Sequence, residues 1–380
     1  MWTIEMLLEK VASAGGSDLI LTAGVPPQIK VLGNLHAVDD RPLAAPETEA
    51  LGLSILNETQ RNTLFHNRSV DLSKGFQGLN RFRFNVFYQR GAIALVARLI
   101  PYRIPSFGEL GLPPIVKQFA LCPHGLVLVT GPAGSGKSTT LAAMIEHINT
   151  QRSAHIICLE DPIEYLHTHR QSIIEQREIY EDAPSFANAL QAVFRQSPDV
   201  IMVGEMRDLE TMQLALTLAE TGHLILGTLH TQDTTHAINR IVDIFPPSHQ
   251  QQVYTQLSMV LSGIISQALL VTADLSRRVL ACEVLHVNNA IGNLIRERQL
   301  QQVYSVIQTG KAEGMVTMNE SLRRLVAEGK IDQDLAMERS PRPRELARML
   351  GVAQRDPTAG YAEGETETPS ESWKTRGGLE

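Results

Sequence analysis

The feature that most constrains how this chain can fold is a glycine-rich segment, Gly131-Pro132-Ala133-Gly134-Ser135-Gly136-Lys137-Ser138. It matches the pattern G-x-x-x-x-G-K-[ST], which occurs between a strand and a helix. In such a loop the backbone N–H groups surround phosphate oxygens, and the helix adds the positive end of its dipole. Lys137 would reach the β- and γ-phosphates, and Ser138 would ligate Mg²⁺. A glycine turn without a ligand is the alternative. Since an apolar run precedes the segment, we expect Gly131 to Thr139 to bind ATP with Mg²⁺.

The sequence around this loop alternates between short apolar runs and amphipathic segments. Strands are predicted at residues 126–130, 155–159, 200–203 and 224–229, and helices begin near Lys137, Ser185 and Asp208. Such alternation predicts an α/β fold in which helices wrap a parallel sheet. Beyond Ser248 the sequence predicts mainly helix, with one hairpin near residues 274–277.

The length of 380 residues predicts more than one domain. Residues 1–100 predict a smaller α+β domain, which includes a hairpin turn at Gly33-Asn34 and an alternating strand at 81–88. A proline-rich stretch at 101–114 predicts a linker. The core then spans 115–290, a helical region spans 291–354, and the aliphatic-poor tail at 355–380 is predicted to be disordered.

Composition excludes several classes of protein. The net charge is −7, from 34 Lys+Arg and 41 Asp+Glu. Proteins that coat nucleic acids are usually basic, so no direct nucleic-acid partner is expected. The three cysteines are far apart and never form a CxxC pair, which fits a reducing compartment and predicts no zinc site. No stretch approaches the roughly 18 apolar residues of a membrane span, so a cytoplasmic protein is predicted.

Three of the predicted strands end in polar side chains, and in open parallel sheets ligands bind beyond the carboxyl ends of the strands. These ends lead to Glu164, Glu205 and His230, in chain order. We expect Glu205 to support the metal or orient water, Glu164 to be the second candidate for the general base, and His230 to sense the γ-phosphate. Both acids could instead be solvated loop residues. His223 begins the strand that His230 follows, about 20 Å away, so it is expected to pack or to lie at an interface.

Arginines in the N-terminal domain are a further candidate. Arg81 and Arg83 lie on the strand face opposite the apolar side chains of 82, 84 and 86, and Arg98 lies on the next strand. One interpretation is a solvated face. The other is that they reach the nucleotide of a neighbouring subunit, because P-loop sites often use arginines supplied in trans.

Together these motifs resemble a known family. The glycine-rich loop is followed, in order, by Glu160-Asp161-Pro162-Ile163-Glu164-Tyr165, by residues 197–208 and by residues 219–231. These segments are similar to the Walker A, Asp box, Walker B and His box of the secretion and type IV pilus motor ATPases. The resemblance accounts for Gly204, which stands where most P-loop ATPases carry an aspartate. It implies a RecA-like core, a PAS-like N-terminal domain and a homohexameric ring in which Arg81, Arg83 and Arg98 approach the nucleotide.

Within that family the chain resembles the twitching-motility (PilT-type) retraction ATPases. It lacks the four-cysteine insertion of assembly ATPases and is too short for their extra N-terminal domains. Residues 290–297 are similar to the retraction signature, except that Gly292 stands where arginine is usual.

The resemblance implies an ATP-driven motor that disassembles pilin at the inner membrane. It would dock peripherally on the pilus platform protein, and a second retraction ATPase could be a further partner. An accessory, assembly, secretion or DNA-uptake motor stays open, as does a nucleotide-gated scaffold with little turnover.

Overall fold

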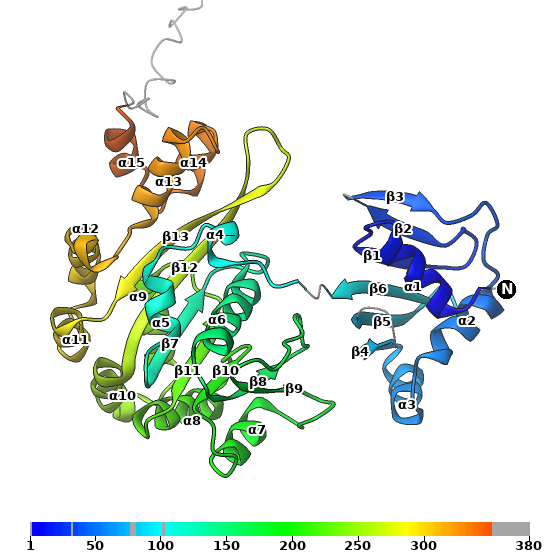
Figure 1. Ribbon diagram of the computed structural model, residues 1–380, viewed down its shortest axis with the longest axis horizontal. Helices are drawn as coiled ribbons and strands as arrows, with labels where there is room; N and C mark the ends of the chain where they lie inside the picture. Colours follow the sequence, from blue (N-terminus) through cyan, green and yellow to red (C-terminus); the bar gives the residue numbers. More distant parts are fainter. Residues whose placement is uncertain (1, 32, 77–80, 101–102, 352–380) are drawn as a thin grey trace, which may run out of the picture.

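The computed structural model describes residues 2–31, 33–76, 81–100 and 103–351, which form two sheets in separate parts of the molecule (Figure 1). The predicted tail at 355–380 and the first two residues of the predicted linker lie outside the described residues. Within the described residues, no helix is both long and apolar enough to cross a membrane.

The N-terminal part is an antiparallel sheet covered by helices. Its six strands have the order β3-β2-β1-β6-β5-β4, and every neighbouring pair is antiparallel. The elements are α1 (Ile4–Ser13), β1 (Asp18–Leu21), β2 (Gln28–Val31), β3 (Asn34–Ala37), α2 (Ala45–Ser54), α3 (Glu58–Asn67), β4 (Ser69–Gly75), β5 (Arg81–Gln89) and β6 (Ala92–Ile100).

The predicted alternation along β5 is confirmed. Phe82, Phe84 and Val86 are fully buried in a core that also contains Leu7 and Leu8 of α1. The arginines between them point to the other face of the sheet, because successive side chains of a strand alternate in direction.

The core is a seven-stranded sheet with the order β13-β12-β7-β11-β10-β8-β9. All neighbouring strands from β12 to β9 are parallel, and β13 pairs antiparallel with β12. Up to β11 the elements are α4 (Phe107–Leu110), α5 (Ile115–Ala120), β7 (Gly125–Thr130), α6 (Lys137–Gln151), β8 (His155–Glu160), β9 (Ile173–Glu178), α7 (Phe186–Val193), β10 (Val200–Val203), α8 (Leu209–Glu220) and β11 (Leu224–Leu229). The four predicted strands and three predicted helix starts match these elements closely.

Helices cover both faces of the core sheet (Figure 1). On one face, Val127 and Val129 of β7 pack against Ile145 of α6. On the other face, Leu126 and Leu128 pack in a cluster that includes residues of α7, α8, α9 (Thr234–Asp243) and α10 (Pro247–Val260). Successive side chains of β7 point to opposite faces of the sheet. Since helices cover both faces, both sets are buried, as expected for a RecA-like α/β core.

The prediction of mainly helix beyond Ser248 is wrong for two long strands, β12 (Leu261–Val271) and β13 (Arg278–His286). Most of β12 is buried. Its sequence therefore reads as a continuous apolar run, which does not distinguish a strand from a helix. The hairpin itself lies where it was predicted. Elements that the sequence did not predict include the edge strands β4 and β9, and α4 within the predicted linker.

The C-terminal region is helical after β13, as predicted. It contains α11 (Asn289–Arg296), η1 (Leu300–Gln302), α12 (Val303–Thr309), η2 (Gly310–Glu313), α13 (Met318–Ala327), α14 (Gln333–Arg339) and α15 (Pro343–Leu350). Leu322 of α13 and Leu346 of α15 are fully buried in a small core with Leu270 of β12. This core fixes the last helices beside the β12–β13 hairpin.

Candidate active site

The glycine-rich loop lies between β7 and α6, the arrangement that its sequence predicts. The backbone of Gly131 has φ +142°, and a Cβ atom there would lie 2.4 Å from the carbonyl oxygen of Gln267. Lys137 is buried, and its Nζ donates hydrogen bonds to the carbonyl oxygens of Gly131 at 2.9 Å and Pro132 at 3.0 Å. Burial lowers the pKa of Lys137, while the negative charges of nearby carboxylates oppose this.

Polar side chains from the ends of neighbouring strands meet beside this lysine. Glu205 follows β10 and His230 follows β11, and His230 Nε2 lies 3.2 Å from Glu205 Oε1. The other ring nitrogen, Nδ1, lies 3.5 Å from Lys137 Nζ. The strand register explains the convergence, because β10 and β11 are parallel neighbours and end at the same edge of the sheet.

These groups line a cavity of about 540 Å³ at the carboxyl edge of the sheet. Its polar lining includes Arg83, Lys137, Ser138, Glu160, Asp161, Glu164, Tyr165, Glu205, Arg207 and His230. The cavity thus combines loop residues with every predicted acid and with His230. Thr139, the last residue of the predicted loop, is held beside it, since its Oγ1 lies 3.0 Å from the hydroxyl of Tyr165.

His223 lies at the opposite end of β11, away from the cavity. Its Nδ1 is 3.0 Å from the carbonyl oxygen of Leu218 and 3.2 Å from Thr221 Oγ1. These contacts fix the turn before the strand, which agrees with the expectation that His223 packs.

The three N-terminal arginines have different surroundings in this chain. Arg83 lines the cavity beside its own glycine-rich loop. Arg81 forms an ion pair with Glu178 of the core, with Nη2 3.0 Å from Oε2. Arg98 forms an ion pair with Asp18 of the N-terminal sheet, with Nε 2.8 Å from Oδ1. The sequence left open a solvated face or a neighbour's nucleotide, and the resemblance implied that all three approach the nucleotide in a ring. The fold brings one of them, Arg83, to the cavity of its own chain.

Two lining residues were missed as site candidates. Arg207 forms an ion pair with Glu205, and this contact together with His230 outweighs burial and lowers the pKa of Glu205. Glu160, at the end of β8, is 7% exposed, and its burial raises its pKa to about 7. The spacing of Arg207 two residues after Glu205 was a usable signal, because alternate residues of an extended segment share a face. Nothing in the sequence distinguished Glu160 from the exposed acids beside it.

Gly204 occupies the position where a Walker B aspartate usually stands, and the structure gives a packing reason for glycine. Its N–H donates to the carbonyl oxygen of Leu159 at 2.8 Å. A Cβ atom at Gly204 would lie 3.1 Å from that same oxygen. Since β8 is a buried strand, its backbone cannot move aside easily, so a larger side chain at this position would strain the sheet.

The residues present fit a magnesium ion shared with a nucleotide. Ser138 and Glu205 line one cavity and offer the hydroxyl and carboxylate oxygens that Mg²⁺ prefers. Among the described residues, no group of three or more His, Cys, Asp or Glu side chains could hold a metal alone. This suits Mg²⁺, which usually binds through one or two protein ligands and the substrate phosphates.

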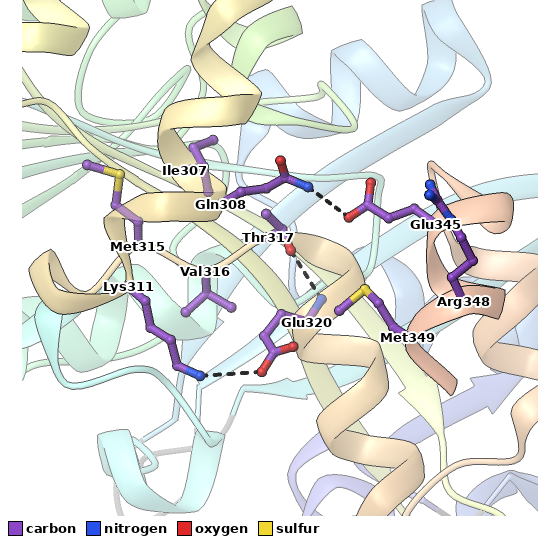
Figure 2. Close-up of a pocket in the computed structure, with 10 residues that line it drawn as sticks. All are labelled: Ile307, Gln308, Lys311, Met315, Val316, Thr317, Glu320, Glu345, Arg348 and Met349. Carbon is purple, nitrogen blue, oxygen red and sulfur yellow. Dashed lines mark hydrogen bonds and ion pairs between the residues drawn. The ribbon is translucent and has the colours of Figure 1, made fainter. Parts of the chain in front are cut away.

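A second cavity, of about 620 Å³, lies between the C-terminal helices and contains no residue of the glycine-rich loop (Figure 2). Its polar side chains bond to one another: Gln308 donates to Glu345, and Lys311 forms an ion pair with Glu320 (Figure 2). The convergent, partly buried charges of the first cavity make that cavity the candidate active site.

Comparison with known proteins agrees with the motif order. A family model described as type II/IV secretion system protein matches residues 109–356. The type IV pilus retractation ATPase PilT of Pseudomonas aeruginosa is 44% identical over 340 residues, which cover 90% of this chain and 98% of that protein. The type IV pilus ATPase PilU of the same organism is 40% identical over 346 residues, which cover 91% of each chain.

The fold agrees as well. A crystal structure of the pilus retraction motor PilT with bound ADP superposes with a TM-score of 0.87 and 49% sequence identity, over 92% of this chain and all of that one. The resemblance found in the motifs is therefore confirmed across nearly the whole chain, and this protein belongs to the type II/IV secretion system family of P-loop ATPases.

Proposed function

We propose that this protein is an ATP-hydrolysing motor that powers type IV pilus retraction, and with it twitching motility. It works as a homohexamer in the cytoplasm and docks on a platform protein of the inner membrane. One observation carries the proposal: Lys137, Glu205 and His230 meet in one cavity, in a chain similar to the retraction motor PilT along nearly its whole length.

The side chains of the cavity suggest a division of roles. The loop of residues 131–139 binds the phosphates through the backbone N–H groups that follow Pro132 and through the ammonium of Lys137. Glu205, ionised and held by Arg207 and His230, orients water at the γ-phosphate. Glu164 is the second candidate for the general base. Ser138 and Glu205 hold Mg²⁺, which when bound supplies positive charge against the phosphate oxygens.

Arg83 is the arginine best placed to act on the nucleotide, since it lines the cavity of its own chain. Asp161 lines the same cavity. Burial raises the pKa of Asp161, and the nearby guanidinium of Arg83 opposes that rise. Arg98, paired with Asp18, keeps only the proposed role at a subunit boundary.

A second candidate function is that of an accessory retraction motor. Gly292 favours it, because the retraction signature usually has an arginine at that position. A Cβ atom there would lie 3.2 Å from the carbonyl oxygen of Ser258, so α10 and α11 approach closely where an arginine would stand.

The test combines a deletion with a phosphate-release assay. Cells that lack the protein should carry excess surface pili and lose twitching, and the wild-type gene should restore it whereas a Lys137→Ala gene should not. Bald cells would indicate an assembly motor. Normal pili with weakened twitching would indicate the accessory role. A purified wild-type protein that binds ATP without releasing phosphate would indicate the scaffold.

A further inference from the structure

One ion pair joins the N-terminal domain to the end of β9 in the core. Among the described residues, two side-chain hydrogen bonds join the two domains: Arg81 Nη2 to Glu178 Oε2 at 3.0 Å, and Gln60 Nε2 to Glu181 Oε1 at 2.8 Å. Only the first is an ion pair, and it is well shielded from water, with 23% of the Arg81 side chain and 5% of the Glu178 side chain exposed. Arg81 is held in turn by Ser73, whose Oγ accepts from Nε at 2.6 Å.

Glu178 connects this ion pair to the loop that carries Glu164. It is the last residue of β9 and lies beside Glu160 of β8 in the strand register. The Glu178 oxygen that accepts from Arg81, Oε2, also accepts from the backbone N–H of Ile163 at 3.3 Å. Ile163, whose N–H the ion pair binds, immediately precedes the candidate base Glu164 in the chain.

Other side chains of the β8–β9 pair hold the same loop. Glu160 Oε2 accepts from the N–H of Glu164 at 3.4 Å, and Gln176 Nε2 donates to the carbonyl oxygen of Tyr165 at 2.7 Å. The backbone from Ile163 to Tyr165 is thus bound at three successive residues to polar side chains, of which Glu178 and Glu160 are buried and Gln176 is half-buried. Two of these groups are carboxylates, so the loop depends on how their charges are compensated.

We infer that Arg81 is a positioning residue, which acts through Glu178 to hold Glu164 at the cavity while the N-terminal domain is docked on the core. The inference deepens the proposed ATPase function and rests on it. Without the guanidinium, Glu178 is a buried carboxylate that has lost its positive partner and lies beside the carboxyl group of Glu160. It then turns towards water, and the N–H of Ile163 loses its acceptor.

The surroundings of the neighbouring arginine, Arg83, support a separate role for Arg81. Arg83 is two residues further along β5 on the same face and lines the cavity, whereas neither Arg81 nor Glu178 lines it. The docked domain therefore places Arg83 at the nucleotide cavity and Arg81 at Glu178, which binds the loop of residues 163–165.

The test uses the purified full-length protein and a double-mutant cycle of Arg81→Ala and Glu178→Ala, which removes the acceptor oxygen as well as the charge. Each single variant should lower kcat by about 10- to 100-fold, the usual loss when a reacting group is misplaced. The Kd for ATP should change much less, and the double variant should be no slower than the slower single variant. Arg81→Lys should recover part of kcat. Gln60→Ala, which removes the other contact between the domains, is the matched control and should stay close to wild type.

Hydrogen exchange supplies a readout that does not depend on activity. The amides of residues 161–166 should exchange faster in Arg81→Ala than in wild type and Gln60→Ala. If Arg81→Ala does not fold, Glu178→Ala should show the same faster exchange. Unchanged exchange overturns the inference, as do effects that multiply in the double variant or a Kd that rises as much as kcat falls. A wild-type protein without turnover would instead count against the proposed function.

Discussion

The carboxyl group of Glu160 should make the stability of this protein depend on pH. Glu160 ends β8 and is 7% exposed. Burial raises its pKa from 4.5 to about 7, hydrogen bonds from Gln176 and from the N–H of Glu164 oppose the rise, and the charges of Glu164 and Glu178 add to it. The folded protein therefore favours the protonated form of Glu160.

The size and sign of the effect follow from proton linkage. A shift from 4.5 to about 7 corresponds to roughly 3 kcal/mol, because one pKa unit is about 1.4 kcal/mol. Between these two pH values the folded chain binds more protons at this site than the unfolded chain, so the free energy of unfolding falls as pH rises. The contribution of the protonated carboxyl is full below the unfolded pKa of 4.5 and is lost as pH passes about 7.

Replacing Glu160 with glutamine isolates this contribution. The amide is neutral at all pH values and keeps an oxygen that can accept the N–H of Glu164. Urea unfolding of the nucleotide-free protein, followed by pulse proteolysis of the core, should show the variant gaining about 3 kcal/mol over wild type between about pH 4.5 and about pH 8. Glu175→Gln, at an exposed acid of β9, is the matched control and should gain much less. A difference between Glu160→Gln and wild type that is constant with pH would refute the reasoning.

Four further results are expected. Lys137→Ala should lower kcat by on the order of 10²-fold or more, since it removes the cation of the glycine-rich loop; phosphate release at the normal rate would show that the loop is misassigned. His230→Ala should lower kcat by on the order of 10²-fold and His223→Ala much less, because only the first contacts Glu205; similar losses in the same assay would contradict the strand-end argument. Gly204→Ala should destabilise the core by about 1–3 kcal/mol, which would lower the thermal midpoint of unfolding. An unchanged midpoint would mean that the backbone of β8 shifts enough to make room for the added methyl group. Mixing Arg83→Ala subunits with Lys137→Ala subunits should restore no activity, since both residues serve one cavity of one chain; recovery in mixed rings would place Arg83 at a neighbour's nucleotide.

Local sequence was sufficient for the parts of the site that a strand end determines. In a parallel sheet all strands end at one edge, so any polar residue that follows a predicted strand is expected there. This places Glu164, Glu205 and His230 around Lys137 without knowledge of any distance, and it separates His223 from them. The glycine-rich loop was predicted for the same reason, since its pattern includes the strand before it and the helix after it.

Tertiary structure alone decided the features that depend on which segments become neighbours. β12 is buried on both faces, so its apolar run carries no period of two, and only its pairing with β7 and β13 makes it a strand. The raised pKa of Glu160 comes from its burial in β8, which pairs at the edge of the sheet with β9, a strand that the sequence did not reveal. The sequence also placed Arg81 and Arg83 on one face and gave no reason to separate their roles. Docking of the N-terminal domain gives them different partners, a buried carboxylate for Arg81 and the cavity for Arg83, because contacts between residues about 100 positions apart follow from domain packing and not from local pattern.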